Sequence, residues 1–132
     1  MLTHLLMICV LACASTTDET LALQVDAPLA RFGCTQPALE QAAIIRDAEA
    51  KHYSIRRLEF LGNESISDWV LRKRMGALQE GEKFRKSNLV RSLKNVSRLK
   101  TLHPVRLSDV MLRLEESDKL VDMVICFKEK KR

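Results

Sequence analysis

Aromatic residues are scarce in this sequence, and it carries no motif for phosphate or metal binding. Phe, Trp and Tyr make up 5% of the 132 residues, so a hydrophobic core must be built mainly from aliphatic side chains. The four glycines form no Gly-rich phosphate loop. There is no CxxC, no Cys/His cluster at zinc-ligand spacing, and no nucleophile at a recognisable spacing from a base. The sequence therefore predicts a protein that is not an enzyme and that uses no cofactor, metal or small-molecule substrate.

The composition is that of a globular protein. It has 46% hydrophobic and 30% charged residues, and its length allows one domain with flanking sequence. The net charge of +5 could serve an acidic partner, an anionic lipid surface or nucleic acid. Lys and Arg alternate with Glu and Asp along most of the chain, and the one dense cationic run is formed by residues 128–132. We interpret this run as a solvated tail.

The chain begins with an apolar stretch that predicts a signal peptide at residues 1–14. The stretch has the length of a signal-peptide core and is too short to cross a bilayer as a helix. The absence of Lys and Arg from its first residues argues against a signal peptide. Cleavage after Ala14 and lipidation of Cys13 at an imperfect lipobox are both compatible with the sequence. The alternative is a buried apolar start. We expect export to the periplasm or the outer membrane, with Cys13 as a candidate lipid anchor.

Two cysteines, Cys34 and Cys126, lie outside the predicted leader. They could form a disulfide in an oxidising compartment. Their separation in the sequence gives no evidence that they meet, so two independent free thiols are an equally open alternative.

The rest of the chain divides into a linker and a region of mixed helices and strands. Residues 15–52 read as a linker, with a helix over residues 37–51 that has a thin apolar stripe. Alternating hydrophobic residues predict strands over residues 53–61, 105–114 and 120–128, and helical periodicity predicts helices from Asp68 to Met75 and from Asn88 to about Leu99. The fold class is therefore α+β, in the order β-α-α-β-β, with a three-stranded sheet and two helices packed on one face.

The motifs in this region resemble those of the POTRA (polypeptide-transport-associated) domain of the outer-membrane barrel-assembly family. The first strand and the turn after it read IRRLEFxGN over residues 55–63, and the capped helix that follows contains DxVLR over residues 68–72. Glu80-Gly81 between the helices and VDMV at residues 121–124 also match. The resemblance spans residues 53–130, which we assign as a single POTRA domain. The Gly-aromatic pair common after the second helix of the family is absent.

The resemblance implies a mixed sheet whose closing strand is central and whose second strand lies at an open edge. Such an edge can be completed by an extended segment of another protein. We place this edge at residues 106–115, with inward and outward side chains alternating along it. The alternative is that the helix over residues 37–51 covers the edge. The candidate partner-binding residues are Val110, Met111, Leu112, Arg113 and Leu114.

The function that the resemblance implies is that of an exported interaction module, accessory to outer-membrane protein assembly or polypeptide transport. Expected partners are outer-membrane barrel proteins or assembly factors, with self-association through the sheet edge as a further expectation. The chain ends soon after the closing strand, so we expect either an independent module or a fragment of a larger system. A rival hypothesis is a small basic nucleic-acid-binding domain. It requires aromatic stacking residues on the sheet, and only Tyr53 is a candidate.

Overall fold

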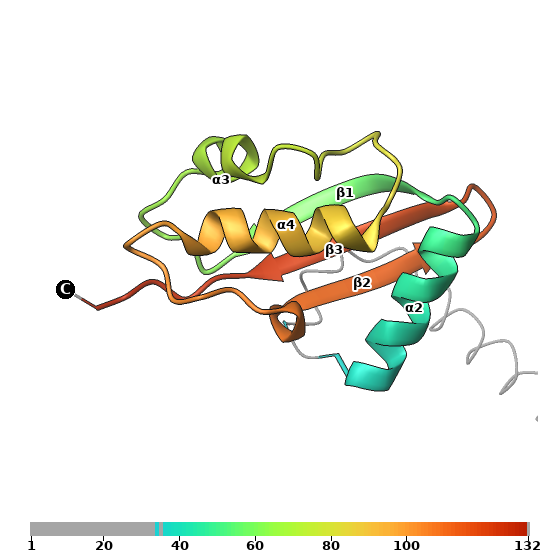
Figure 1. Ribbon diagram of the computed structural model, residues 1–132, viewed down its shortest axis with the longest axis horizontal. Helices are drawn as coiled ribbons and strands as arrows, with labels where there is room; N and C mark the ends of the chain where they lie inside the picture. Colours follow the sequence, from blue (N-terminus) through green and yellow to red (C-terminus); the bar gives the residue numbers. More distant parts are fainter. Residues whose placement is uncertain (1–33, 35, 132) are drawn as a thin grey trace, which may run out of the picture.

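The computed structural model describes Cys34 and residues 36–131. Residues 1–33, which include the predicted signal peptide and Cys13, lie outside the described residues, as do residues 35 and 132. Helices and strands cover much of the described part (Figure 1). They are, in chain order, α2 (Ala38–Ala50), β1 (Ser54–Leu61), α3 (Asp68–Met75), α4 (Lys86–Ser97), the 3-10 turn η2 (Leu107–Asp109), β2 (Val110–Glu115) and β3 (Leu120–Cys126).

The three strands form one mixed sheet in the order β1-β3-β2. β1 pairs with β3 in parallel, and β2 pairs with β3 antiparallel. The central strand carries the most deeply buried row, in which Val121, Met123 and Ile125 are each 0% exposed. The mixed three-stranded sheet predicted from the sequence is confirmed, and the closing strand lies at its centre.

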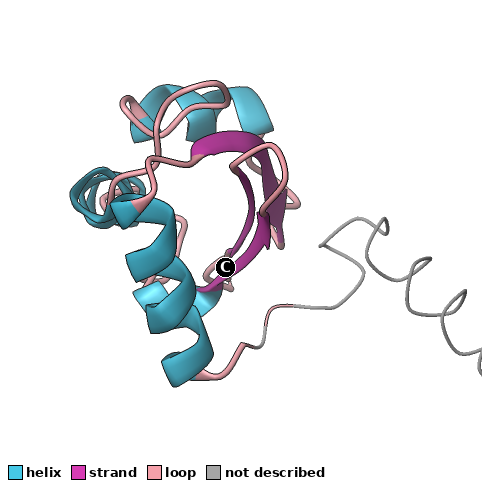
Figure 2. Ribbon diagram, turned by 90° about the vertical axis from the view of Figure 1, so that its right-hand side faces the viewer, coloured by secondary structure: helices cyan, strands magenta, loops and turns pink. Residues whose placement is uncertain are grey.

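The structure has three helices around the sheet, where the sequence predicted two. α2, which was assigned to the linker, packs against β2, and its Ile45 and Ala48 belong to the hydrophobic core (Figure 2). The observed order is therefore α-β-α-α-β-β. The helix itself was expected over residues 37–51. Its docking beside β2 was one of the two alternatives left open by the sequence, because its few buried positions are Gln41, Ile45 and Ala48, and a polar residue and an alanine give little hydrophobic signal.

The ends of the helices follow local signals only in part. α3 begins after Ser67, whose hydroxyl accepts a hydrogen bond from the Val70 N–H, and it ends at Gly76, which has a φ of 62°. α4 starts at Lys86, two residues before its predicted start, and has no side-chain cap. The buried ring of Phe84 fixes the chain just before this helix, so tertiary packing sets its start.

Two irregularities in the strands differ from expectation. The strand predicted over residues 105–114 begins only at Val110, because residues 107–109 form the 3-10 turn η2. A β-bulge lies in β1, where the pairing register with β3 shifts between Ile55 and Arg57. Gly62 ends β1 with a φ of +84°, and a Cβ there would lie 2.0 Å from the Phe127 carbonyl oxygen. Only glycine allows β1 and the end of β3 to approach so closely.

Cys34 and Cys126 form a disulfide, which decides between the two alternatives left open by the sequence. It joins the segment before α2 to the last residue of the central strand, across a sequence separation of 92 residues. The arm that precedes the sheet in sequence is therefore covalently attached to the centre of the fold.

Candidate functional site

The predicted partner-binding residues lie along β2, at one edge of the sheet. Val110 and Leu112 face the main core and are 0% and 1% exposed, and Leu114 is partly buried on the same side. Met111 is buried on the opposite face beside Val124. Partner binding at this edge stays a prediction. Whether a partner strand can pair with β2 depends on the groups that already hydrogen-bond to its outer backbone.

Two glutamine side chains hydrogen-bond to the outer backbone groups of β2. The Gln36 amide donates to the Leu112 carbonyl oxygen at 2.8 Å and accepts from the Leu112 N–H at 3.0 Å. The Gln41 amide donates to the carbonyl oxygens of Leu107 and Val110, each at 2.6 Å. A side-chain amide carries both a donor and an acceptor, so Gln36 reproduces the pairing of one residue of a neighbouring strand.

The far end of the β2 edge has no such cap. In an antiparallel pair, alternate residues direct their N–H and C=O groups away from the partner strand, so Leu114 presents its groups on the same side as Leu112. No hydrogen bond to these outward groups of Leu114 is found among residues 36–131. The edge is therefore capped at Val110 and Leu112 and open at Leu114.

The opposite edge of the sheet, along β1, is closed by backbone. The Ile55 N–H donates to the Glu82 carbonyl oxygen at 2.9 Å, and the Ile55 carbonyl oxygen accepts from the Gly81 N–H at 2.7 Å. The Phe84 N–H donates to the Tyr53 carbonyl oxygen at 2.8 Å. The covering segment leads directly into the core through Phe84, which is 2% exposed.

Side chains continue this closure along β1. The Leu58 N–H donates to Glu80 Oε1 at 3.1 Å, and the Leu58 carbonyl oxygen accepts from Arg72 Nη2 at 2.8 Å. Arg72 and Glu80 also form an ion pair at 3.2 Å. Ile55 and Leu58 are therefore both satisfied on the outer side of β1, and the edge resists strand addition at these two residues.

A charged cluster on the sheet face away from the helices joins the two edge strands to the central one. The Asp122 carboxylate accepts from Arg56 Nη2 of β1 at 2.6 Å and from Arg113 Nη2 of β2 at 3.0 Å. Burial would raise the pKa of Asp122, but the hydrogen bonds from Arg56 and Arg113 outweigh burial and lower this pKa below its ordinary value. Arg113 thus lies on the outer face of the sheet, on the side expected from the sequence, and its guanidinium is held there by Asp122.

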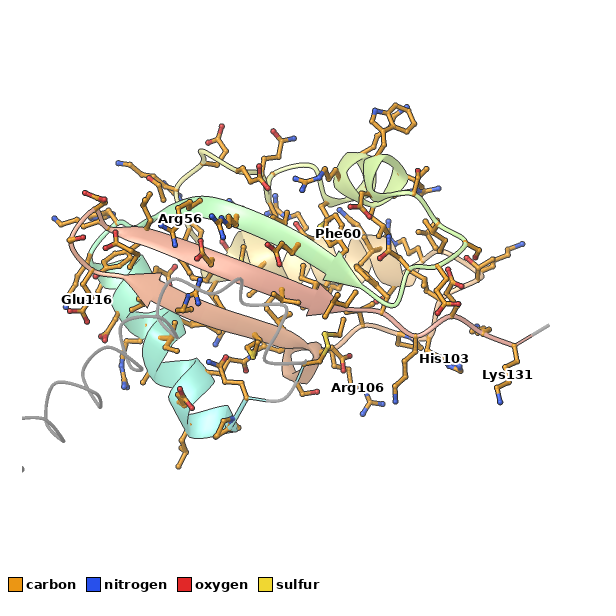
Figure 3. All side chains as sticks on the ribbon, turned by 180° about the vertical axis from the view of Figure 1, so that it is seen from behind. Arg56, Phe60, His103, Arg106, Glu116 and Lys131 are labelled. Carbon is orange, nitrogen blue, oxygen red and sulfur yellow. A yellow bond between two sulfur atoms is a disulfide. The ribbon has the colours of Figure 1, made fainter. Side chains whose placement is uncertain are left out.

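The disulfide holds the capping arm in position. Cys34 lies two residues before Gln36, and its partner Cys126 ends the central strand. Figure 3 shows this disulfide near the start of β2, at the end of the strand where α2 begins. The attachment keeps the Gln36 amide close to Leu112, because the arm cannot move far from β3 while the bond is intact.

No pattern in the sequence predicts the capping role of Gln36 and Gln41. Both are polar residues at the start of a predicted helix, where exposure to solvent is the usual outcome. Gln41 is instead 6% exposed. Its partners are 66 and 69 residues away in sequence, so only the tertiary fold brings them together.

Comparison with known proteins supports the fold but identifies no family. No family model matches the chain, and no curated protein matches it. One solved structure that it resembles is the crystal structure of BamA from Haemophilus ducreyi lacking POTRA domains 1-3, with a TM-score of 0.50 and 24% sequence identity. The match covers 59% of this chain and 14% of that one. A likeness at this identity shows a shared fold and nothing further.

The described part of the chain has neither a metal-binding cluster nor a helix that could span a membrane. Among Cys34 and residues 36–131, no group of three or more His, Cys, Asp or Glu side chains is arranged to hold a metal ion. None of the helices described is both long and apolar enough to cross a membrane. The two sheet edges thus provide the strongest candidate site.

Proposed function

We propose that this protein is an exported, non-enzymatic interaction module, accessory to outer-membrane protein assembly or polypeptide transport, which binds extended segments along β2. The observation that carries the proposal is the chemistry of the β2 edge. Side-chain amides of Gln36 and Gln41 fill the place of a neighbouring strand there, whereas the start of the β1 edge is closed by backbone and Leu58 by the ion-paired Arg72 and Glu80. A side chain can rotate away from an edge without unfolding the domain.

Binding requires the two glutamines to leave the edge. An incoming strand then pairs with the outer groups of Leu112 and Leu114 and replaces the hydrogen bonds that Gln36 made. Each side-chain hydrogen bond contributes about 1 kcal/mol net, so displacement costs a few kcal/mol, which a strand of several residues can offset. The open groups of Leu114 offer the first point of contact.

The packing of α2 fits a displaceable cover. A cleft of about 640 Å³ borders α2, lined on its far side by Lys86 and Leu107. The main contacts of α2 are with β2, and its buried side chains are few. Withdrawal of α2 would expose an apolar strip beside β2, which would favour partners with alternating apolar residues.

Two observations support the cellular setting. A disulfide that joins residues far apart in sequence is typical of proteins in oxidising compartments such as the periplasm. The fold is shared with a structure of BamA, although the chain spans 14% of that protein. On this basis we propose outer-membrane barrel proteins or assembly factors as partners, with a second copy of the chain competing for the same edge.

The proposal is tested by photo-crosslinking in the native envelope. A photoreactive amino acid at Glu116, exposed at the end of β2, should capture outer-membrane barrel proteins or their assembly factors. The same probe at Glu82, exposed on the segment that closes β1, is the matched control. Capture should rise when Gln36→Ala is added. Equal capture from both positions, or capture only of unrelated proteins, would contradict the proposal.

A further inference from the structure

The chain carries a strongly basic segment that is distinct from its basic C-terminal run. Residues 83–108 contain eight Lys and Arg and no Asp or Glu. Lys and Arg alternate with Glu and Asp along most of the chain, but they do not do so in this segment. It includes all of α4, which lies across the face of the sheet that carries the main hydrophobic core (Figure 1).

The helix directs these charges to solvent. The buried residues of α4 are Leu89, Ser92, Leu93 and Val96. At 100° per residue, Arg91, Lys94 and Arg98 fall on the opposite side of the helix, and all three are exposed. We name these three residues the basic face.

No acidic side chain neutralises the basic face. The ion pairs of the described part of the chain involve Arg56, Arg72 and Arg113, and none includes a residue of α4. Cations spaced three and four residues apart on one helix repel one another by a few tenths of a kcal/mol per pair. An external anion would remove this cost.

An apolar groove adjoins the basic face. It has a volume of about 490 Å³, and its lining includes Val90, Leu93, Val105 and Leu107, with Lys94 and Arg98 beside them. Cations that border an apolar strip match the interface of a bilayer, where phosphates lie above the acyl chains. We infer that the basic face and this groove bind the surface of a membrane that contains anionic phospholipid.

A lipid surface explains this combination better than nucleic acid does. Single-stranded nucleic acid is bound by stacking its bases on aromatic side chains, and α4 contains none. A duplex offers phosphates but no apolar layer for the groove. The inference does not depend on strand addition at β2, so either one can fail without the other.

The test is sedimentation with vesicles of phosphatidylethanolamine containing 30% phosphatidylglycerol, in low salt. The triple variant Arg91→Gln, Lys94→Gln, Arg98→Gln should bind on the order of 100-fold more weakly than the unchanged protein. The matched control is Lys128→Gln, Lys130→Gln, Lys131→Gln, which removes the same charge from the C-terminal run. It should weaken binding about threefold or less. Thermal melting of each variant checks that the fold is kept.

Three results would overturn the inference. Equal loss in the two triple variants would show a response to net charge alone. Binding to vesicles without phosphatidylglycerol that matches binding with it would exclude recognition of the anionic headgroup. A single-stranded DNA oligomer that binds the basic face more tightly than the vesicles do would make it a nucleic-acid site.

Discussion

The two edges of the sheet differ in what closes them, although they belong to strands of similar length. The β1 edge is covered by a backbone segment that continues into the core at Phe84. The β2 edge is covered by the amides of Gln36 and Gln41, on an arm attached through the Cys34–Cys126 disulfide. The segment that closes β1 is part of the hydrophobic core, whereas the β2 edge is closed by side chains of a segment outside the sheet.

This difference indicates which edge can exchange partners. Opening the β1 edge would remove a buried aromatic ring from the core, whereas opening the β2 edge requires a few side-chain hydrogen bonds to break. Proteins commonly protect both edges of a sheet against unwanted pairing. Under the proposed function, the weaker protection at β2 makes it the edge at which a partner strand would bind.

The largest expected effect is at the β1 edge. Replacing Phe84→Ala should lower the free energy of unfolding by about 3–5 kcal/mol, because the ring is almost fully buried. Urea denaturation measures this change. Leu39→Ala is the control, since Leu39 is 88% exposed and its loss should change stability by less than about 0.5 kcal/mol. A loss below about 1 kcal/mol for Phe84→Ala would show that the β1 cover is not part of the core.

The second effect concerns the attachment of the arm. The double variant Cys34→Ser, Cys126→Ser should lose about 2–4 kcal/mol of stability, because the disulfide restricts the unfolded chain. Hydrogen exchange should also speed up at the Leu112 amide relative to that of Leu58. If exchange at the two amides rose by the same factor, the disulfide would stabilise the domain as a whole without holding the β2 cover.

The third effect is smaller and local. Gln36→Ala should cost about 1–2 kcal/mol, because it removes two hydrogen bonds at Leu112. The Leu112 amide should then exchange roughly tenfold faster, while that of Leu58 is unchanged. The control Gln79→Ala alters an exposed glutamine in the segment before the β1 cover. An unchanged rate at Leu112 would show that Gln36 does not protect this edge.

The smallest expected effect is a loss of stability at acidic pH, and it comes from Asp122, which joins both edge strands to β3. Its pKa is lower in the folded than in the unfolded protein, so its contribution to stability is complete above the unfolded value and is lost as pH falls through the folded value. Stability should therefore fall below about pH 4. Denaturation curves from pH 2 to 6 measure this loss, and Asp122→Asn should reduce it. The same pH dependence in both proteins would contradict the role of Asp122.

The sheet could be predicted from the sequence because its strands alternate clearly. Val121, Met123 and Ile125 are separated by residues of the opposite face, and Gly76 marks the end of α3 as expected. The docking of α2 beside β2 stayed only an alternative, since the buried positions of this helix are the polar Gln41, Ile45 and the small Ala48. Helical propensity and hydrophobic periodicity report which residues form a helix, but not which surface that helix covers.

The candidate site was predictable only in its location. The family resemblance implied that β2 is an edge strand, yet the occupancy of that edge depends on Gln36, whose partner Leu112 is 76 residues away. The basic face was missed because the charge was averaged over the whole chain. Counting acidic residues over residues 83–108 alone would have revealed it.

The most direct test of the central claim is amide protection measured by NMR during titration with a peptide from a terminal strand of an outer-membrane barrel protein. Strand addition at β2 predicts that the amides of Leu112 and Leu114 become more protected as the peptide is added. The amides of Ile55 and Leu58 on the opposite edge should not change. Protection that appears along β1, or binding that leaves Leu112 and Leu114 unaffected, would contradict the account.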